Sequence, residues 1–252
     1  MVTDGATDDP GWQVTGPHRL IAQWASAAQP LAVAALAQTD QPLRCGGTWA
    51  VGLDLLGNDP SGGVGGVAFP WSALPLLPEP LHRAQLSVIY PGYPVASTGE
   101  TPAAHRFRIS RDAAHLDGLL PIGPDKRRMI KEPHRWILGI ALGDCAASPL
   151  VVWDGSHLVM RTALLAALGT DDPHRWGDRD VTAAYQAARA QVFATCRRVE
   201  VPIKMGQATV LHRHTLHGVA PWSAGAQAPP EGRVIAYFRP QMPSAHAWLA
   251  QP

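Results

Sequence analysis

The sequence predicts a mainly β fold with flanking helices, and three observations support this fold class. The chain has 24 glycines and 24 prolines among 252 residues, which favours many turns and short strands over a helical bundle. Several short segments alternate apolar and polar residues, as half-buried strands do. The length is also typical of one large all-β unit. We therefore expect a single domain over residues 1–252.

Composition argues against several classes of partner. The formal net charge of +1 gives no excess of positive potential for binding nucleic acid or a membrane surface. The most apolar run, Leu31–Ala37, is too short to span a bilayer. Cys45, Cys145 and Cys196 lack C-x-x-C spacing and are odd in number, which suits a reducing compartment. The sequence predicts a cytoplasmic protein with small-molecule partners, and it does not indicate an oligomeric state.

The N-terminal part of the chain predicts helices followed by turns. Residues 1–16 are polar, and we expect them to be disordered. Apolar residues recur at helical spacing over about residues 17–38, where Pro30 should divide the segment into two helices. The glycine-dense residues 44–69 predict loops or hairpin turns. A half-buried strand is expected over Ala84–Tyr90.

The C-terminal part predicts further strands around a helical insertion. The insertion, about residues 158–198, contains strong helix formers in two stretches. Alternating or continuous apolar runs predict the strands Trp136–Leu142, Pro149–Trp153, Val199–Ile203, Ala208–His212 and Arg233–Phe238.

A possible metal-binding pair lies in the segment R-D-A-A-H-L-D-G-L-L, residues 111–120. In an extended chain His115 and Asp117 would project to the same side, where an imidazole and a carboxylate could bind one ion. A distant histidine would complete the two-histidine, one-carboxylate set of non-haem Fe(II) oxygenases. His217, in L-H-R-H-T-L-H-G-V, is the candidate. The H-x-D triplet alone is a weak signal, because about one is expected by chance among 11 histidines.

The order of several motifs resembles that of the phytanoyl-CoA dioxygenase family of Fe(II)/2-oxoglutarate dioxygenases. The H-x-D pair is followed by P-L-V-V-W-D-G-S-H, residues 149–157, which stands in place of the family's apolar strand ending in P-G-[ST]-H. His217 and Arg233 follow in the expected order. The resemblance covers residues 111–239, about half of the chain.

This resemblance implies a double-stranded β-helix, or jelly-roll, with Fe(II) and 2-oxoglutarate as cofactors. It implies that an arginine holds the distal carboxylate of 2-oxoglutarate, a duty that suits the planar guanidinium. Arg233 is the candidate, although it lies sixteen positions after His217, farther than is usual in the family. Arg239, on the same face of the predicted strand, is the reserve. Trp136 matches an aromatic residue that lines the co-substrate pocket in some relatives; a tryptophan of the core is the alternative.

Candidate substrate contacts come from two other segments. His105–Ser110 alternates as a strand would, and Arg106, Arg108 and Arg111 could hold an anionic substrate near the metal. A solvated strand face is the alternative explanation for these arginines. His157 could contact the substrate, orient a ligand or end a turn.

The leading hypothesis is an Fe(II)- and 2-oxoglutarate-dependent dioxygenase that uses molecular oxygen to hydroxylate, or otherwise oxidise, a small organic molecule. The presence of Asp117 favours hydroxylation over halogenation, because related halogenases replace this carboxylate with a small residue. One alternative is a cupin-like metal-dependent hydrolase or isomerase, which would have no need for Arg233. A barrel that binds a small ligand without catalysis is the other alternative.

Overall fold

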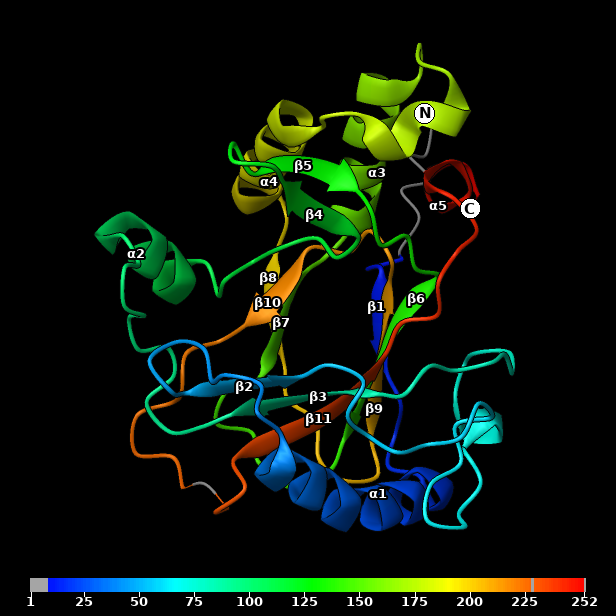
Figure 1. The fold of residues 1–252 in the computed structure, drawn as a ribbon, viewed down its shortest axis with the longest axis vertical. Helices are drawn as coiled ribbons and strands as arrows, with labels where there is room; N and C mark the ends of the chain where they lie inside the picture. Colours follow the sequence, from blue (N-terminus) through cyan, green and yellow to red (C-terminus); the bar gives the residue numbers. More distant parts are fainter. Residues whose placement is uncertain (1–8, 228, 252) are drawn as a thin grey trace, which may run out of the picture.

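The protein is described by a computed structural model that covers residues 9–227 and 229–251. Its largest element is a six-stranded antiparallel sheet with the strand order β1-β9-β6-β11-β3-β2 (Figure 1). The strands of this sheet are β1 (Trp12–Val14), β2 (Trp49–Gly52), β3 (Gln85–Ile89), β6 (Trp136–Ala141), β9 (Ala208–His212) and β11 (Arg233–Phe238).

A second antiparallel sheet has three strands in the order β10-β7-β8. They are β7 (Leu150–Trp153), β8 (Arg198–Val201) and β10 (His217–Val219). Apolar side chains from both sheets form one buried cluster, which includes Ile137, Val152 and Ile235. Two antiparallel sheets packed in this way form a jelly-roll core, and flanking helices cover it, so the predicted fold class is confirmed.

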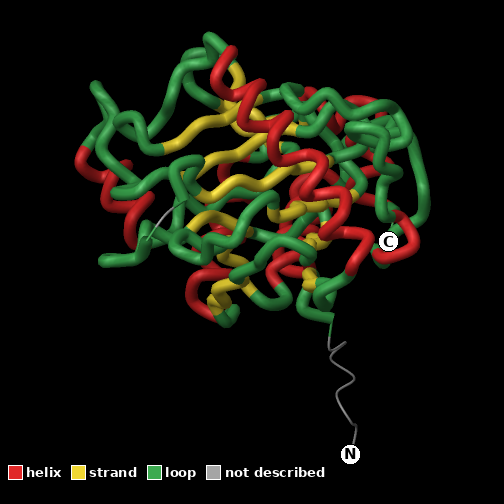
Figure 2. The backbone as a smooth tube through the Cα atoms, turned by 90° about the horizontal axis from the view of Figure 1, so that it is seen from below, coloured by secondary structure: helices red, strands yellow, loops and turns green. Residues whose placement is uncertain are grey.

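Helix α1 (Arg19–Gln38) crosses the outer face of the six-stranded sheet (Figure 2). Ile21, Trp24 and Ala28 are fully buried there beside sheet residues such as Leu138. Pro30 lies inside the helix, so the predicted division into two helices is wrong. Packing on the sheet compensates for the hydrogen bond that this proline cannot make. Among the described residues, α1 is the helix whose length and apolar composition would suffice to cross a membrane.

The predicted helical insertion contains α3 (Ser156–Leu168), a 3₁₀ segment (Pro173–Asp178) and α4 (Thr182–Thr195). A hairpin of β4 (Leu119–Ile122) and β5 (Arg127–Ile130) packs beside these helices, together with α5 (Ala245–Ala250). Their apolar side chains form a second buried cluster around Trp248. In this way the insertion covers the chain segment that follows His115 and Asp117.

Some local predictions were wrong. His105–Ser110 is not a strand, because Pro102–Ser110 forms helix α2, with Thr101 accepting a hydrogen bond from the Ala104 amide at its start. The prediction of disorder over residues 1–16 fails for β1, which pairs with β9; residues 1–8 lie outside the described part of the chain. The glycine-rich residues 44–69 do form mostly turns, but they also contain β2.

Candidate metal centre

Three potential metal ligands converge at the edge of the three-stranded sheet. The ligand atoms of His115, Asp117 and His217 all lie within 4.8 Å of one another. Backbone pairing brings the two histidines together: the His115 amide donates to the His217 carbonyl at 2.8 Å, and the His217 amide donates back at 3.1 Å. Among the described residues this is the one group of three or more histidine, cysteine or acidic side chains so close together.

Both histidines have their ring nitrogens in the arrangement that a metal requires. Nδ1 of His115 lies 3.1 Å from the Ala113 carbonyl, and Nδ1 of His217 lies 2.9 Å from the Thr215 carbonyl. Because a carbonyl oxygen only accepts, each Nδ1 carries a proton, which leaves Nε2 as the nitrogen of each ring that can bind a metal. Nε2 of His115 faces Asp117 Oδ1 at 3.2 Å, and Nε2 of His217 faces Asp117 Oδ2 at 3.8 Å. Both Nε2 atoms therefore face the shared carboxylate.

The charge states also suit a cation. Burial, assisted by nearby His115, lowers the pKa of His217 to about 4, so its imidazole is neutral at pH 7. Burial disfavours the charged form of Asp117, but the hydrogen bond from His115 and the charges of His217 and Arg239 lower its pKa well below the usual value. Packing disfavours the charged form of His115, but Asp117 outweighs this effect and raises the pKa of His115. A bound cation would take the place of that shared proton.

An ion pair between the buried Asp112 and the partly exposed Arg198 fixes the segment that carries His115 and Asp117. Asp112 has a left-handed backbone, with φ of 54°, and its carboxylate accepts two hydrogen bonds of 2.7 Å from the Arg198 guanidinium. Its carbonyl accepts a 2.8 Å bond from the Val219 amide. The backbones approach so closely that a Cβ on Gly218 would lie 2.1 Å from the Asp112 carbonyl oxygen. The glycine after His217 therefore permits the two ligand-bearing segments to pair.

Arg239 contacts the carboxylate of Asp117 from the end of β11. Its Nη1 donates to Asp117 Oδ2 at 2.9 Å, and its Nη2 donates to the side-chain oxygen of Gln85. The Arg239 amide donates to Nε2 of His82 at 2.8 Å. One oxygen of Asp117 is thus held by arginine, while the other stays beside His115.

Arg233 lies at the other end of β11, on the same face as Ile235 and Arg239. Ile235 belongs to the cluster between the two sheets. The Arg233 side chain is buried, and its Nη1 has no hydrogen-bond partner among the described residues. A guanidinium keeps its charge in proteins, so a buried nitrogen without a partner calls for an acceptor, such as an ordered water or the carboxylate of a ligand.

The other predicted contacts lie in different surroundings. Trp136 packs in the cluster beneath α1 with Leu138, on the face of β6 turned away from the inter-sheet cluster. Figure 1 shows α2, which carries Arg106 and Arg108, at the periphery of the fold. Arg108 is paired there with Glu100 at 2.9 Å.

Arg111 and His157 also make contacts that do not involve the three potential ligands. The Arg111 guanidinium lies 4.7 Å from the centre of the Phe193 ring. His157 lies in the first turn of α3, where its ring contacts Gly11 and lies 4.9 Å from the His212 ring. The structure thus brings together His115, Asp117, His217 and Arg239, and leaves the predicted substrate contacts elsewhere.

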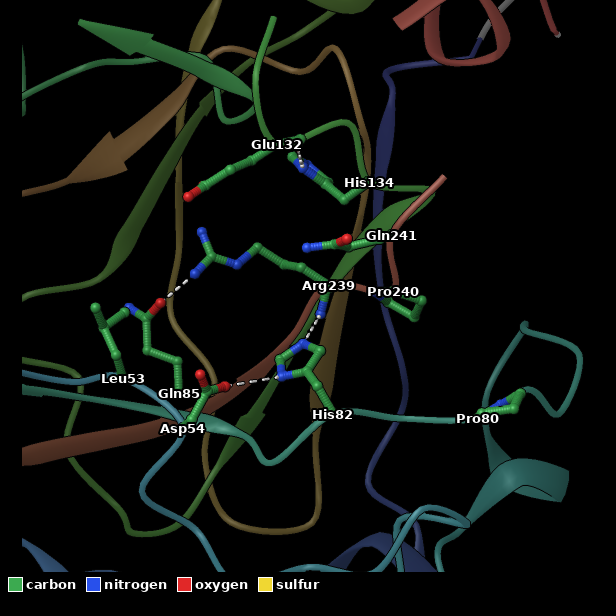
Figure 3. A pocket seen from close by; sticks show the side chains of 10 residues that line it. All are labelled: Leu53, Asp54, Pro80, His82, Gln85, Glu132, His134, Arg239, Pro240 and Gln241. Atoms are coloured by element: carbon green, nitrogen blue, oxygen red, sulfur yellow. Dashed lines mark hydrogen bonds and ion pairs between the residues drawn. The ribbon is translucent and has the colours of Figure 1, made fainter. Parts of the chain in front are cut away.

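A cavity of about 480 Å³ is lined in part by Arg239, the residue that donates to Asp117 (Figure 3). Apart from Arg239, its lining residues could not be selected from the sequence, because they come from segments far apart in the chain. The lining consists of Leu53, Asp54, Pro80, His82, Gln85, Glu132, His134, Arg239, Pro240 and Gln241.

Among known proteins, similarity to this chain was found only in the comparison with solved structures. No family model matches the chain, and no curated protein matches it. The chain is similar to the non-heme alpha ketoglutarate dependent carbocyclase SnoK from nogalamycin biosynthesis, with 14% identity, coverage of 98% of this chain and 88% of that chain, and a TM-score of 0.48. It is also similar to AviO1 from Streptomyces viridochromogenes Tue57, with 14% identity, coverage of 94% and 92%, and a TM-score of 0.41.

A third similar structure is the non-heme alpha ketoglutarate dependent epimerase SnoN, also from nogalamycin biosynthesis. Its identity to this chain is 17%, its coverage is 63% of this chain and 45% of that chain, and its TM-score is 0.33. Because these identities are low, the function of this chain rests on the geometry of its own site.

Proposed function

We propose that this protein is an Fe(II)- and 2-oxoglutarate-dependent dioxygenase that oxidises a small organic molecule. The convergence of His115, Asp117 and His217 within 4.8 Å carries this proposal. Two imidazoles and one carboxylate are the donor set that holds Fe(II) and leaves coordination positions open. When bound, iron would supply the activation of molecular oxygen, for which 2-oxoglutarate provides electrons.

Arg233 is the proposed anchor for the distal carboxylate of 2-oxoglutarate. Its buried, unpartnered Nη1 supports this role among the described residues. Arg239, the alternative anchor, is already engaged by Asp117 and Gln85. A bidentate bond from Arg233 would fix the co-substrate between the two sheets. The environment of Trp136 favours the core role over co-substrate contact.

Hydroxylation is the proposed outcome. A C–H bond of the substrate becomes C–OH; one oxygen atom of O₂ enters the product and the other enters succinate, while 2-oxoglutarate loses carbon dioxide. The chain's own residues would orient the reactants: the Ala113 and Thr215 carbonyls fix the two imidazole rings, and Arg239 fixes the carboxylate. The motif order supports membership of the phytanoyl-CoA dioxygenase family as part of the proposal.

The proposed setting is the cytoplasm, with a small molecule as partner and no nucleic acid or membrane. Cys45, Cys145 and Cys196 are all free thiols, which supports a reducing compartment. The formal charge of +1 supports the exclusion of nucleic acid.

Anaerobic addition of Fe(II) and 2-oxoglutarate tests the proposal. We expect a weak visible charge-transfer band from the chelated keto acid, and then, after admission of oxygen, equal amounts of succinate and carbon dioxide. Zn(II) in place of Fe(II) should give neither result. A metal-dependent hydrolase or a passive binding protein would give no band and no succinate, and that result would refute the oxygenase.

A further inference from the structure

The cavity beside Arg239 has a lining that restricts what it can bind. It shares Arg239 with the candidate metal centre, so a molecule in the cavity would contact the arginine that donates to Asp117. Figure 3 shows the Arg239 side chain extending into the cavity, with its guanidinium between Gln85 and Glu132. Apart from Leu53, Pro80 and Pro240, the lining residues are polar. Such a lining suits a polar molecule better than a lipid or a flat aromatic one.

His134 contributes a hydrogen-bond acceptor that has no partner. The residue is only 3% exposed, and its Nδ1 donates to the Glu132 carbonyl at 3.0 Å. Burial lowers the pKa of His134, which keeps the imidazole neutral at pH 7. Its Nε2 therefore carries a lone pair, and this nitrogen has no hydrogen-bond partner among the described residues. A buried acceptor of this kind calls for a donor from a ligand or an ordered water.

The charges around the cavity also favour a ligand with hydrogen-bond donor groups over an anionic ligand. The positive charge of Arg239 is already paired with Asp117. The remaining histidine of the lining, His82, lies close to an acidic side chain: its Nδ1 is 3.5 Å from an Asp54 carboxylate oxygen. The side chain of Glu132 has no ion pair or hydrogen bond within the described chain. An anion entering the cavity would meet an unpaired carboxylate and find no free cation among its described lining residues.

We propose that this cavity is the substrate-binding site and that it takes a small molecule bearing hydroxyl or ammonium groups, with Glu132 and His134 as the acceptors. This inference rests on the proposed function, since it names the substrate class of that same oxygenase. It replaces the anionic substrate that the arginines at positions 106, 108 and 111 suggested, because Arg108 is paired with Glu100 and Arg111 stacks on Phe193.

Three small ring molecules of matched size test the charge preference: 4-aminocyclohexanol, cyclohexane-1,4-diol and 4-hydroxycyclohexanecarboxylate. Binding to the Zn(II)- and 2-oxoglutarate-loaded protein is measured by NMR titration, with assigned resonances that locate each probe. We expect the amine to bind about tenfold more tightly than the carboxylate, with the diol between them, as one charge-assisted hydrogen bond would give. The largest shifts should occur at Glu132, His134 and Gln241.

Glu132→Gln should bring the affinities of the amine and the diol to within about twofold of each other, because the charge is removed while the shape is retained. Asp125→Asn, on the exposed turn between β4 and β5, is the matched control and should leave the order of affinities unchanged. Tightest binding of the carboxylate would overturn the inference. So would shifts outside the cavity, or no binding of the amine and diol at tens of millimolar.

The metal-free protein separates this test from the test of the proposed function. Probe binding that persists without Zn(II) and 2-oxoglutarate reports on the cavity alone. If the protein fails to bind the metal while the amine still binds at Glu132, the oxygenase proposal fails and the cavity's preference stands. Normal binding of metal and co-substrate with the wrong probe preference refutes the cavity inference alone.

Discussion

The two ends of β11 each carry an arginine on the same face, and their surroundings differ. At one end, Arg239 donates to Asp117 and to Gln85, so its charge is compensated within the protein. At the other end, Arg233 is buried, and its Nη1 has no partner among the described residues. A guanidinium is not deprotonated in proteins, so the buried side chain of Arg233 keeps its positive charge. In the proposed function, this contrast separates an arginine that positions a protein carboxylate from one that would bind the carboxylate of 2-oxoglutarate.

The largest expected effect comes from removing the carboxylate that Arg239 holds. Asp117→Ala should weaken Fe(II) binding by more than about 100-fold, since loss of a ligand exceeds the 10- to 100-fold effect of its supporting residues. Hydroxylation should be abolished. Isothermal titration with Fe(II) under nitrogen, together with a succinate assay, measures both effects. Full activity of this variant would refute the ligand assignment.

Arg233→Ala should raise the dissociation constant of 2-oxoglutarate about 100-fold, because it removes one partner of a buried, hydrogen-bonded charge pair. Metal affinity should stay within about twofold of the wild-type value, since Arg233 does not contact the three metal ligands. Arg233→Lys is the matched control and should recover part of the loss, because it keeps the charge without the planar fork. Unchanged co-substrate affinity in Arg233→Ala would assign the anchor to Arg239 instead.

Arg239→Gln should show the opposite pattern. Metal affinity should fall about 10-fold, as is typical when the residue that orients a ligand is lost, while 2-oxoglutarate affinity at saturating metal stays nearly constant. Arg135→Gln removes a surface arginine, 3.5 Å from Glu79, and provides the control. A large loss of co-substrate affinity with normal metal binding would reverse the roles of the two arginines.

The sequence predicted six of the nine strands in the two main sheets and the three potential ligands, but it did not predict β1, β2, β10 or the side chains that contact the ligands. The apolar runs of β6 and β7 suffice to identify buried strands, because their side chains are hydrophobic on both faces. The alternation in His105–Ser110 was misleading. Six residues fit either period, and the Thr101 cap with Pro102 at the first helical position determined the helix.

Long-range contacts account for what the sequence could not predict. Asp117 and Arg239 are 122 positions apart, and Asp112 and Arg198 are 86 apart. No local pattern marks such pairs, because they depend on how the sheets pack. The same holds for β1, whose three residues form a strand only through pairing with β9.

The ion pair between Arg198 and Asp112 provides a weaker test of how the ligand segment is positioned. Arg198→Gln should lower the free energy of unfolding by about 1 to 3 kcal/mol, because the nearly buried Asp112 carboxylate loses charge-assisted hydrogen bonds while Arg198 is partly exposed. Metal affinity should fall modestly as well. Arg197→Gln, whose arginine is largely exposed, is the neighbouring control. Equal effects of both variants in urea denaturation would contradict a special role for Asp112.

The partly buried His212 extends the comparison with Arg233, because an imidazole, unlike a guanidinium, can lose its proton and become neutral. Burial, followed by the charge of His157, lowers the pKa of His212 to about 4, from 6.5. The unfolded chain therefore binds more protons between these values, and the stabilising contribution of neutral His212 is lost as pH falls from about 6.5 to about 4. His212→Asn should reduce the drop in melting temperature between pH 7 and pH 5. An unchanged drop would contradict this assignment.

The central claim is that His115, Asp117 and His217 hold one metal ion. A crystal structure with Mn(II), a redox-stable substitute for Fe(II), and 2-oxoglutarate, measured with anomalous scattering, tests it most directly. We predict one manganese peak bound by Nε2 of His115, Nε2 of His217 and a carboxylate oxygen of Asp117, with the co-substrate's distal carboxylate at Arg233. A peak at another group of side chains, or no peak at saturating Mn(II), would contradict the account.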